Sequence, residues 1–273
     1  MKRILIAIVL LSGTFVLHAQ TSEELYQEGM KLIDDEKYEE AAAKFKDAVS
    51  KDKQNENAIY EAAWCLNEIG EYAEAITYTD MYEPADKYEK SKKYCERGYA
   101  YYKLESQDNA VQAYETALEA VPDDGTALRG IGDVYYNSDD DYEKAIEYYE
   151  KAVELDEDNS KGCYFKLGWL YNDMAEYDDA INVLLKAIDY DDEDADAYRE
   201  LGYAYYQKGE NNSAIYQLEK NIKLDPESKF GHYYLGLVYI ATGEKEKARE
   251  MYTKLKSIDE DQAEKLKAEI DKN

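Results

Sequence analysis

Residues 195–228 read ADAYRELGYAYYQKGENNSAIYQLEKNIKLDPES, and this stretch decides the fold. In its first half, Tyr198, Leu201 and Tyr205 fall three or four positions apart around the small residue Gly202. That spacing places side chains on one face of an α-helix. Gly209 then marks a turn before a second stretch of the same kind. The segment therefore predicts two helices joined by a turn.

The same pattern recurs along the chain with a period of 34 to 36 residues. One series of small residues comprises Gly29, Ala63, Gly98, Gly132, Gly168, Gly202 and Gly236. A second series comprises Ala41, Ala75, Ala110, Ala145, Ala180, Ala214 and Ala248. Small residues let two helix axes approach closely, and one helix pair cannot bury its apolar face alone. The sequence therefore predicts seven helix pairs that stack on one another.

These residues resemble the tetratricopeptide repeat. Its Gly-x-x-Tyr element appears at Gly98/Tyr101, Gly132/Tyr135, Gly168/Tyr171, Gly202/Tyr205 and Gly236/Tyr239. Its Ala-aromatic-Ala element appears at Ala41/Phe45/Ala48, Ala110/Tyr114/Ala117 and Ala145/Tyr149/Ala152, and its closing proline at Pro122 and Pro226. The resemblance implies an all-α, right-handed superhelical solenoid. Its seven repeats are expected at about 22–55, 56–90, 91–124, 125–160, 161–194, 195–228 and 229–262, followed by a C-terminal capping helix at 263–273.

The second repeat departs from the family pattern. It has Ala63 where the family has glycine and Thr79 where it has an aromatic residue, and Pro84 comes several residues early. Proline inside a helix removes a hydrogen bond and clashes with the preceding turn. We therefore predict a shortened or kinked second helix in this repeat, with an irregular segment at 81–90.

The first residues have the pattern of a secretory signal peptide. Lys2 and Arg3 precede an apolar stretch at 4–17, and Ala19 offers a cleavage site before Gln20. The alternative is an uncleaved N-terminal anchor. No later stretch is apolar for long enough to span a bilayer. We expect an exported protein, periplasmic or extracellular, with no membrane span after cleavage.

Charge narrows the classes of partner. The 273-residue chain carries 33 basic and 61 acidic residues, a formal net charge of -28. Nucleic acid binding needs basic side chains that neutralise phosphates, so it is excluded. Three cysteines, Cys65, Cys95 and Cys163, fall inside predicted helices and are expected to pack as small apolar residues. A Cys65–Cys95 disulfide is the alternative.

The chain offers few residues for catalysis or metal binding. After cleavage His232 is the only histidine, and its repeat position is one where the family packs a side chain. Asp192, Asp194 and Asp196 have the spacing of a calcium loop, but Ala197 and Tyr203 replace its glycine and glutamate. The acidic links between repeats are interpreted as solvated edges, with cation binding as the alternative. We expect no enzyme activity, cofactor or metal.

The candidate binding surface is a stripe along the first helices. Counting the small residue of each first helix as position 8, positions 5, 9 and 12 share one face. In the tetratricopeptide family this face lines a concave groove that receives a peptide or helix. Aromatic residues with few rotatable bonds favour recognition. The candidate partner-binding residues are Tyr60, Trp64, Asn67, Tyr99, Tyr102, Arg129, Tyr136, Phe165, Trp169, Asn172, Arg199, Tyr203, Tyr206 and Tyr233.

The predicted function is a non-enzymatic scaffold or adaptor of the cell envelope that binds a peptide or protein segment, with the acidic charge favouring a basic partner. Two other interpretations remain open. The stripe aromatics serve only as packing, or the groove binds carbohydrate through ring stacking and asparagine hydrogen bonds. Binding of a chain-terminal carboxylate is not supported, because Arg129 and Arg199 lie two repeats apart with no matching lysine.

Overall fold

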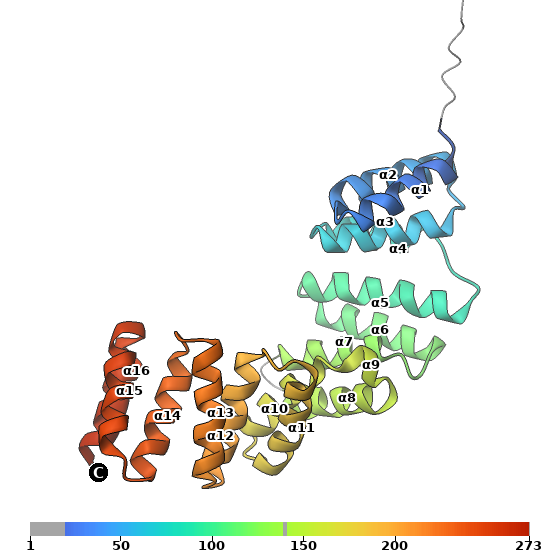
Figure 1. Cartoon of the computed structure of the whole chain (residues 1–273). Coiled ribbons are helices and arrows are strands. Elements are labelled where there is room, and N and C mark those ends of the chain that lie inside the picture. The colour runs from blue at the N-terminus through green and yellow to red at the C-terminus, as the bar shows by residue number, and fades with distance from the viewer. Residues whose placement is uncertain (1–19, 139–140, 273) are drawn as a thin grey trace, which may run out of the picture. The chain divides into compact units, whose positions relative to one another are not determined.

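The computed structural model of the chain describes residues 20–138 and 141–272, and these form α-helices with no β-strand (Figure 1). The predicted signal peptide at 1–19 and most of the Asp139–Asp141 turn lie outside the described residues. The chain divides into two compact units, residues 1–82 and 83–273. Each is a run of helix pairs, so the predicted all-α helical solenoid is confirmed.

The first unit contains two helix pairs. Its helices are α1 (Ser22–Asp34), α2 (Tyr38–Lys51), α3 (Glu56–Glu68) and α4 (Tyr72–Thr79). α4 has 8 residues where α2 has 14, so the predicted shortening of this second helix is confirmed. The irregular segment that follows is shorter than the predicted 81–90, because α5 already begins at Lys87. Asp86 caps α5 by accepting hydrogen bonds from the backbone N–H groups of Tyr88 and Glu89.

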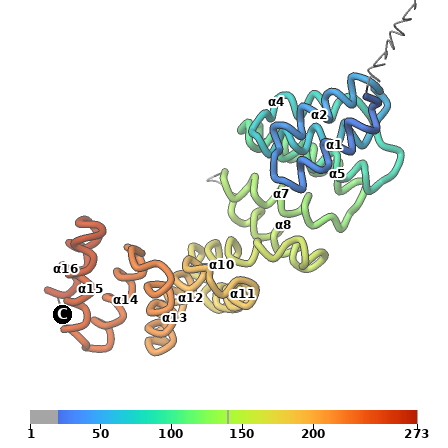
Figure 2. The backbone as a smooth tube through the Cα atoms, turned by 45° about the horizontal axis from the view of Figure 1, so that its top comes forward, coloured from blue at the N-terminus to red at the C-terminus, as the bar shows by residue number. Residues whose placement is uncertain are grey.

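The second unit continues the series of pairs with two additional helices. Its helices are α5 (Lys87–Lys103), α6 (Gln107–Ala120), α7 (Gly125–Tyr136), α8 (Tyr142–Leu155), α9 (Glu157–Ser160), α10 (Cys163–Asp173), α11 (Tyr177–Tyr190), α12 (Ala195–Gln207), α13 (Asn211–Leu224), α14 (Lys229–Ala241), α15 (Lys245–Ile258) and α16 (Glu260–Lys272). The short α9 fills the extra length between α8 and α10. Within this unit each helix from α5 to α8 packs on the next, α8 contacts both α9 and α10, and the series continues from α10 to α16 (Figures 1 and 2).

In five of the described helix pairs, a glycine of the first helix faces a large buried side chain of the second. A Cβ added at Gly132 meets the Tyr149 ring at 2.6 Å, and one added at Gly202 meets Leu218 Cγ at 2.6 Å. Tyr149 and Leu218 are fully buried. In the last pair Gly236 faces Leu266 of α16 instead. The final helix therefore covers the apolar face that a further repeat would otherwise bury.

In six helix pairs of the described residues, the turn uses the left-handed backbone region. Gly70, Gly209 and Gly243 adopt φ values of 84°, 76° and 79°. At the equivalent turns Glu36, Glu105 and Ala175 adopt φ values of 58°, 58° and 60°. Glycine visits this region without the steric cost that a Cβ imposes. Three turns are therefore held in a strained conformation by the packing of their helices.

The first helices of the second unit form its more closely packed side. α5 contacts α7, α10 contacts α12, and α12 contacts α14, whereas the second helices in the described residues make no comparable contacts with one another. This arrangement places the predicted stripe along the row of first helices. All three cysteines are buried inside helices, as their predicted role as small apolar residues requires.

Candidate functional site

Most residues of the predicted stripe are half-buried. This holds in the first unit for Tyr60 and Trp64, and in the second for Tyr99, Tyr102, Arg129, Tyr136, Phe165, Trp169, Arg199, Tyr203, Tyr206 and Tyr233. The two asparagines differ: Asn67 is 2% exposed and Asn172 is 5% exposed. The aromatic members thus combine packing inside the protein with a face left in solvent.

An edge-to-face aromatic pair recurs between neighbouring helix pairs. Trp64 packs on Tyr38 at 5.4 Å between ring centroids, with an interplanar angle of 89°. Trp169 packs on Tyr142 at 5.7 Å and 89°, and Tyr203 on Tyr177 at 6.3 Å and 78°. In each case the position-9 residue meets the first residue of the preceding second helix. These contacts lock the stripe aromatics in defined orientations.

A recess in the second unit is built around one of these aromatic pairs. Its lining consists of Trp169, Asn172, Asp173, Tyr177, Glu200, Tyr203 and Tyr234, and its volume is about 240 Å³. We call it the Trp169 recess. Asn172 Nδ2 donates to the Glu200 carbonyl oxygen at 3.0 Å and to Glu200 Oε2 at 3.1 Å. α10 and α12 are thereby joined beneath the aromatic rings.

The Trp169 recess contains a buried carboxylate. Glu200 is 8% exposed, and its Oε1 accepts hydrogen bonds from Arg199 Nε at 3.2 Å and Nη2 at 3.0 Å. Burial, followed by the negative charge of Glu200, raises the pKa of Tyr234 to about 12. Burial also raises the pKa of Tyr203. Tyr203 and Tyr234 therefore stay protonated and neutral at physiological pH.

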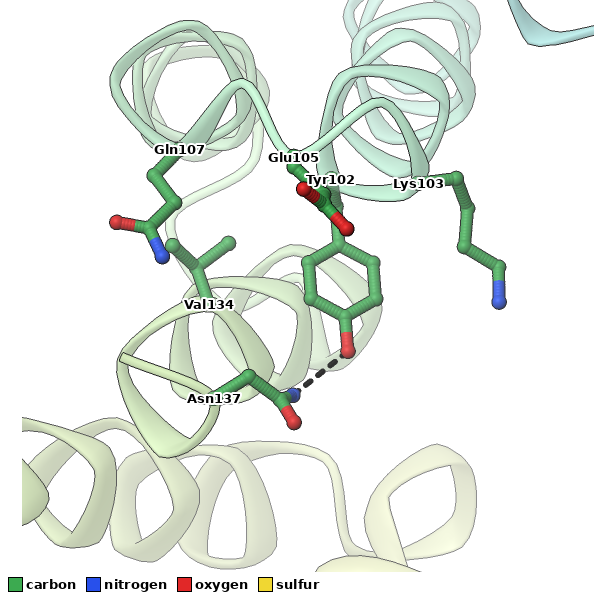
Figure 3. A pocket seen from close by; sticks show the side chains of 6 residues that line it. All are labelled: Tyr102, Lys103, Glu105, Gln107, Val134 and Asn137. Carbon is green, nitrogen blue, oxygen red and sulfur yellow. Dashed lines mark hydrogen bonds between the residues drawn. The ribbon is translucent and has the colours of Figure 1, made fainter. Parts of the chain in front are cut away.

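A second recess lies where the aromatic pair is missing. The α6 helix begins with Gln107 rather than tyrosine, and position 9 of α7 is Asp133. Between α5, α6 and α7 lies a recess of about 670 Å³, lined by Tyr102, Lys103, Glu105, Gln107, Val134 and Asn137 (Figure 3). Asn137 Nδ2 donates to the Tyr102 hydroxyl at 2.6 Å across it. The stripe is thus hollow and polar here.

Sequence reasoning missed the residues at position 6 and at the starts of the second helices. Glu200 and Tyr234 occupy position 6, and Tyr177 begins α11. At the same position Lys166 forms an ion pair with Asp133, whose Oδ1 also accepts from Tyr149 Oη at 2.6 Å. Positions 6 and 9 are i, i+3 neighbours on a helix. This spacing could have predicted that the residues at position 6 lie beside the stripe.

The remaining candidate groups take structural roles. His232 is buried, and its Nε2 lies 3.0 Å from the Pro226 carbonyl oxygen. Across residues 20–138 and 141–272, no cluster of three or more histidine, cysteine, aspartate or glutamate side chains has the geometry to hold a metal ion. In the same ranges no helix has the length and apolarity needed to span a membrane.

Family models match most of the chain. Tetratricopeptide repeat models match residues 32–87, 95–160 and 232–262, and a TPR repeat model matches residues 168–209 and 202–243. No curated protein sequence matches the chain.

Solved structures of repeat proteins are similar in fold. The C-terminal part of a TPR repeat-containing protein from Cytophaga hutchinsonii is 20% identical, with a TM-score of 0.67 over 86% of this chain and 95% of that one. YrrB, described as a TPR protein with an unusual peptide-binding site, is 24% identical, with a TM-score of 0.62 over 72% and 97%. MamA is 31% identical, with a TM-score of 0.55 over 61% and 96%.

Proposed function

We propose, since the chain belongs to the tetratricopeptide-repeat family of protein-interaction scaffolds, that it is an exported adaptor. The adaptor binds an extended segment of another envelope protein along its aromatic stripe. The adaptor has no catalytic role of its own. Export rests on the pattern of Lys2, Arg3 and the apolar stretch at 4–17.

The observation that carries the proposal is the state of the stripe aromatics. Trp169 and Tyr203 are half-buried, and each is held by an edge-to-face contact with a tyrosine of the preceding helix pair. A ring whose orientation is already set loses little conformational entropy when a ligand covers its free face. Such rigid, half-exposed aromatic residues are enriched among the residues that dominate binding energy.

Two further observations support a peptide or protein as the ligand. YrrB, which shares the fold, is described as having a peptide-binding site. The net charge of -28 favours encounter with basic partners through long-range attraction. A carbohydrate ligand has no such dependence on charge, so the binding of a basic protein is distinguished by its weakening in moderate salt.

Affinity capture tests the proposal with the full chain as bait in an envelope extract. One variant carries Trp169→Ala, which removes a stripe aromatic with its two ring contacts to Tyr136 and Tyr142. The matched control carries Tyr148→Ala, which removes a half-buried aromatic of α8 stacked on Tyr135 at 6.0 Å, outside the stripe. Both variants must first show wild-type helicity by circular dichroism.

We expect a discrete client protein to be retained by the wild type and by Tyr148→Ala, and lost with Trp169→Ala. If the wild type and both variants all retain the client, the stripe is not the binding site and the proposal is refuted. Equal loss with both variants means that the loss reflects stability rather than a binding surface.

A further inference from the structure

We propose that the Trp169 recess binds the side-chain ammonium group of a lysine residue in the partner protein. This inference rests on the proposed function, since it names the chemistry that one part of the stripe recognises. Three observations at the recess support it: a buried hydrogen-bond acceptor without a partner, an excess of negative charge, and aromatic rings that line the recess.

The unpaired acceptor is Asn172 Oδ1. Asn172 lines the recess and is buried, and both of its Nδ2 hydrogens are used by Glu200, through the carbonyl oxygen and Oε2. Turning the amide over would set its oxygen against two other oxygens, so the orientation is determined by these partners. Oδ1 then has no hydrogen-bond partner among the described residues. The proposal places the ammonium group against this oxygen, where it supplies the missing hydrogen bond.

The charges around the recess leave a net negative balance. Arg199 is the one cation that bonds Glu200, and it is shared with Asp196, to which its Nη1 also donates. Asp173 adds an exposed carboxylate to the lining of the recess. Arg199 therefore serves the carboxylates of Glu200 and Asp196, and the carboxylate of Asp173 adds a further negative charge to the lining. A further positive charge relieves this imbalance, and a buried, low-dielectric setting strengthens the attraction.

Aromatic rings complete the surround. Trp169, Tyr177, Tyr203 and Tyr234 line the recess, and the rings of Tyr203 and Tyr234 lie 4.9 Å apart between centroids. Cations are attracted to the faces of tryptophan and tyrosine rings within about 6 Å. Elsewhere in this protein lysines take such places, as Lys247 does 5.0 Å from the Tyr239 centroid. Within the described residues no lysine of the chain lies over a ring of the recess.

The geometry favours an ammonium over a guanidinium group. Both oxygens of Glu200 already accept hydrogen bonds, Oε1 from Arg199 and Oε2 from Asn172. Among the buried side chains of the lining, Asn172 Oδ1 is therefore the acceptor without a partner, whereas the carboxylate of Asp173 is exposed. A guanidinium group binds best to a pair of acceptors in one plane, whereas an ammonium is a compact charge that needs no such pair.

A small-molecule titration tests the inference without knowledge of the client. The probe is N-acetyl-lysine methylamide, and the protein is the full chain with Trp64→Phe, so that Trp169 is the only fluorescent tryptophan. Binding is followed by Trp169 fluorescence and by line broadening in the NMR spectrum of the probe. N-acetyl-norleucine methylamide, which lacks the ammonium, and N-acetyl-arginine methylamide are compared at the same ionic strength.

We expect saturable binding of the lysine probe with a dissociation constant in the millimolar range, and at least ten-fold weaker binding of the norleucine and arginine probes. Glu200→Gln weakens lysine binding at least ten-fold. Asp173→Asn changes an exposed side chain, so it leaves the fold intact and weakens binding about three-fold. Glu193→Gln, an equal charge change at an exposed site between α11 and α12, leaves binding within two-fold.

The inference is overturned by the absence of saturable binding in both readouts. It is also overturned by equal binding of norleucine or arginine, or by equal effects of Asp173→Asn and Glu193→Gln. If a client is captured through Trp169 but the lysine probe does not bind, the proposed binding along the stripe is supported and the proposed lysine recognition is refuted. If the lysine probe binds specifically but capture of a client does not depend on Trp169, the proposed binding along the stripe is refuted and the Trp169 recess is still a cation-binding site.

Discussion

Replacing Gly202 with alanine tests the claim that close helix approach sets the positions of the small residues. The added Cβ lies 2.6 Å from Leu218 Cγ, 2.9 Å from Leu218 Cδ2 and 3.3 Å from the Leu218 backbone nitrogen. Leu218 is fully buried, so it has no free space into which to retreat. Overpacking of this kind costs about 1–3 kcal/mol, against which alanine gains up to ~1 kcal/mol in helix propensity.

The matched control is Gly162→Ala, the same chemical change at a site with nothing within 4 Å of the added Cβ. We expect this variant to be neutral or stabilised by about 0.4–1 kcal/mol. Because alanine brings a similar gain at both sites, the two variants differ by the overpacking cost of about 1–3 kcal/mol in the free energy of unfolding, which corresponds to about 2–12 °C in Tm for a protein of this size. Scanning calorimetry on both purified variants measures the difference.

A second variant identifies the cause of the loss. Leu218→Ala alone costs about 2–5 kcal/mol because it opens a cavity. Combined with Gly202→Ala, it removes the clash, and the new methyl group fills part of the cavity. The double variant is therefore less destabilised than the sum of the single ones. Additive losses, or equal Tm values for Gly202→Ala and Gly162→Ala, refute the close-approach explanation.

Three further predictions follow from other features. Ala175→Gly raises stability by about 0.5–1 kcal/mol and Gly209→Ala lowers it by about 1 kcal/mol, because both turns use the left-handed region; unchanged urea midpoints for both contradict this. Tyr149→Phe lowers the free energy of unfolding by about 1–3 kcal/mol, since the buried hydroxyl donates a hydrogen bond to Asp133 at 2.6 Å. A loss smaller than the error of the urea titration refutes a stabilising role of this hydrogen bond. Burial and the hydrogen bond to Glu157 raise the pKa of Tyr164 from 10.0 to about 12, so its stabilising contribution is complete below pH 10 and disappears as the pH rises from 10 to 12. The difference in tyrosinate absorbance at 295 nm between the wild type and Tyr164→Phe measures this ionisation, and a midpoint of that difference at pH 10 opposes the prediction.

Much of the fold follows directly from the sequence. The recurring small residues predict the helix pairs because most of the glycines mark a close contact such as that of Gly132 with Tyr149. A contact that recurs once per repeat needs a small residue at the same position of each repeat. The shortened α4 follows from the local chemistry of Pro84. The three strained turns could not be predicted in this way. Glu36, Glu105 and Ala175 carry no sign of a left-handed backbone, which the packing of their helices imposes.

The candidate site was predicted in part. Trp169 and Tyr203 lie on the row of first helices, as their helical spacing indicates. Their contacts with Tyr142 and Tyr177 depend on how one pair stacks on the next, which a single period does not describe. Glu200 is a charged residue that composition rules place in solvent. It is buried because Arg199 and Asn172 satisfy its carboxylate, and that combination appears only in three dimensions.

Site-directed photocrosslinking in intact cells tests the central claim most directly. A photoreactive phenylalanine analogue replaces either Tyr206, a half-buried member of the stripe on α12, or Tyr216, which is 58% exposed on α13. If the first helices carry the binding surface, irradiation yields a discrete protein adduct from position 206 and none from position 216. The same adduct from both positions, or an adduct from position 216 alone, contradicts the account.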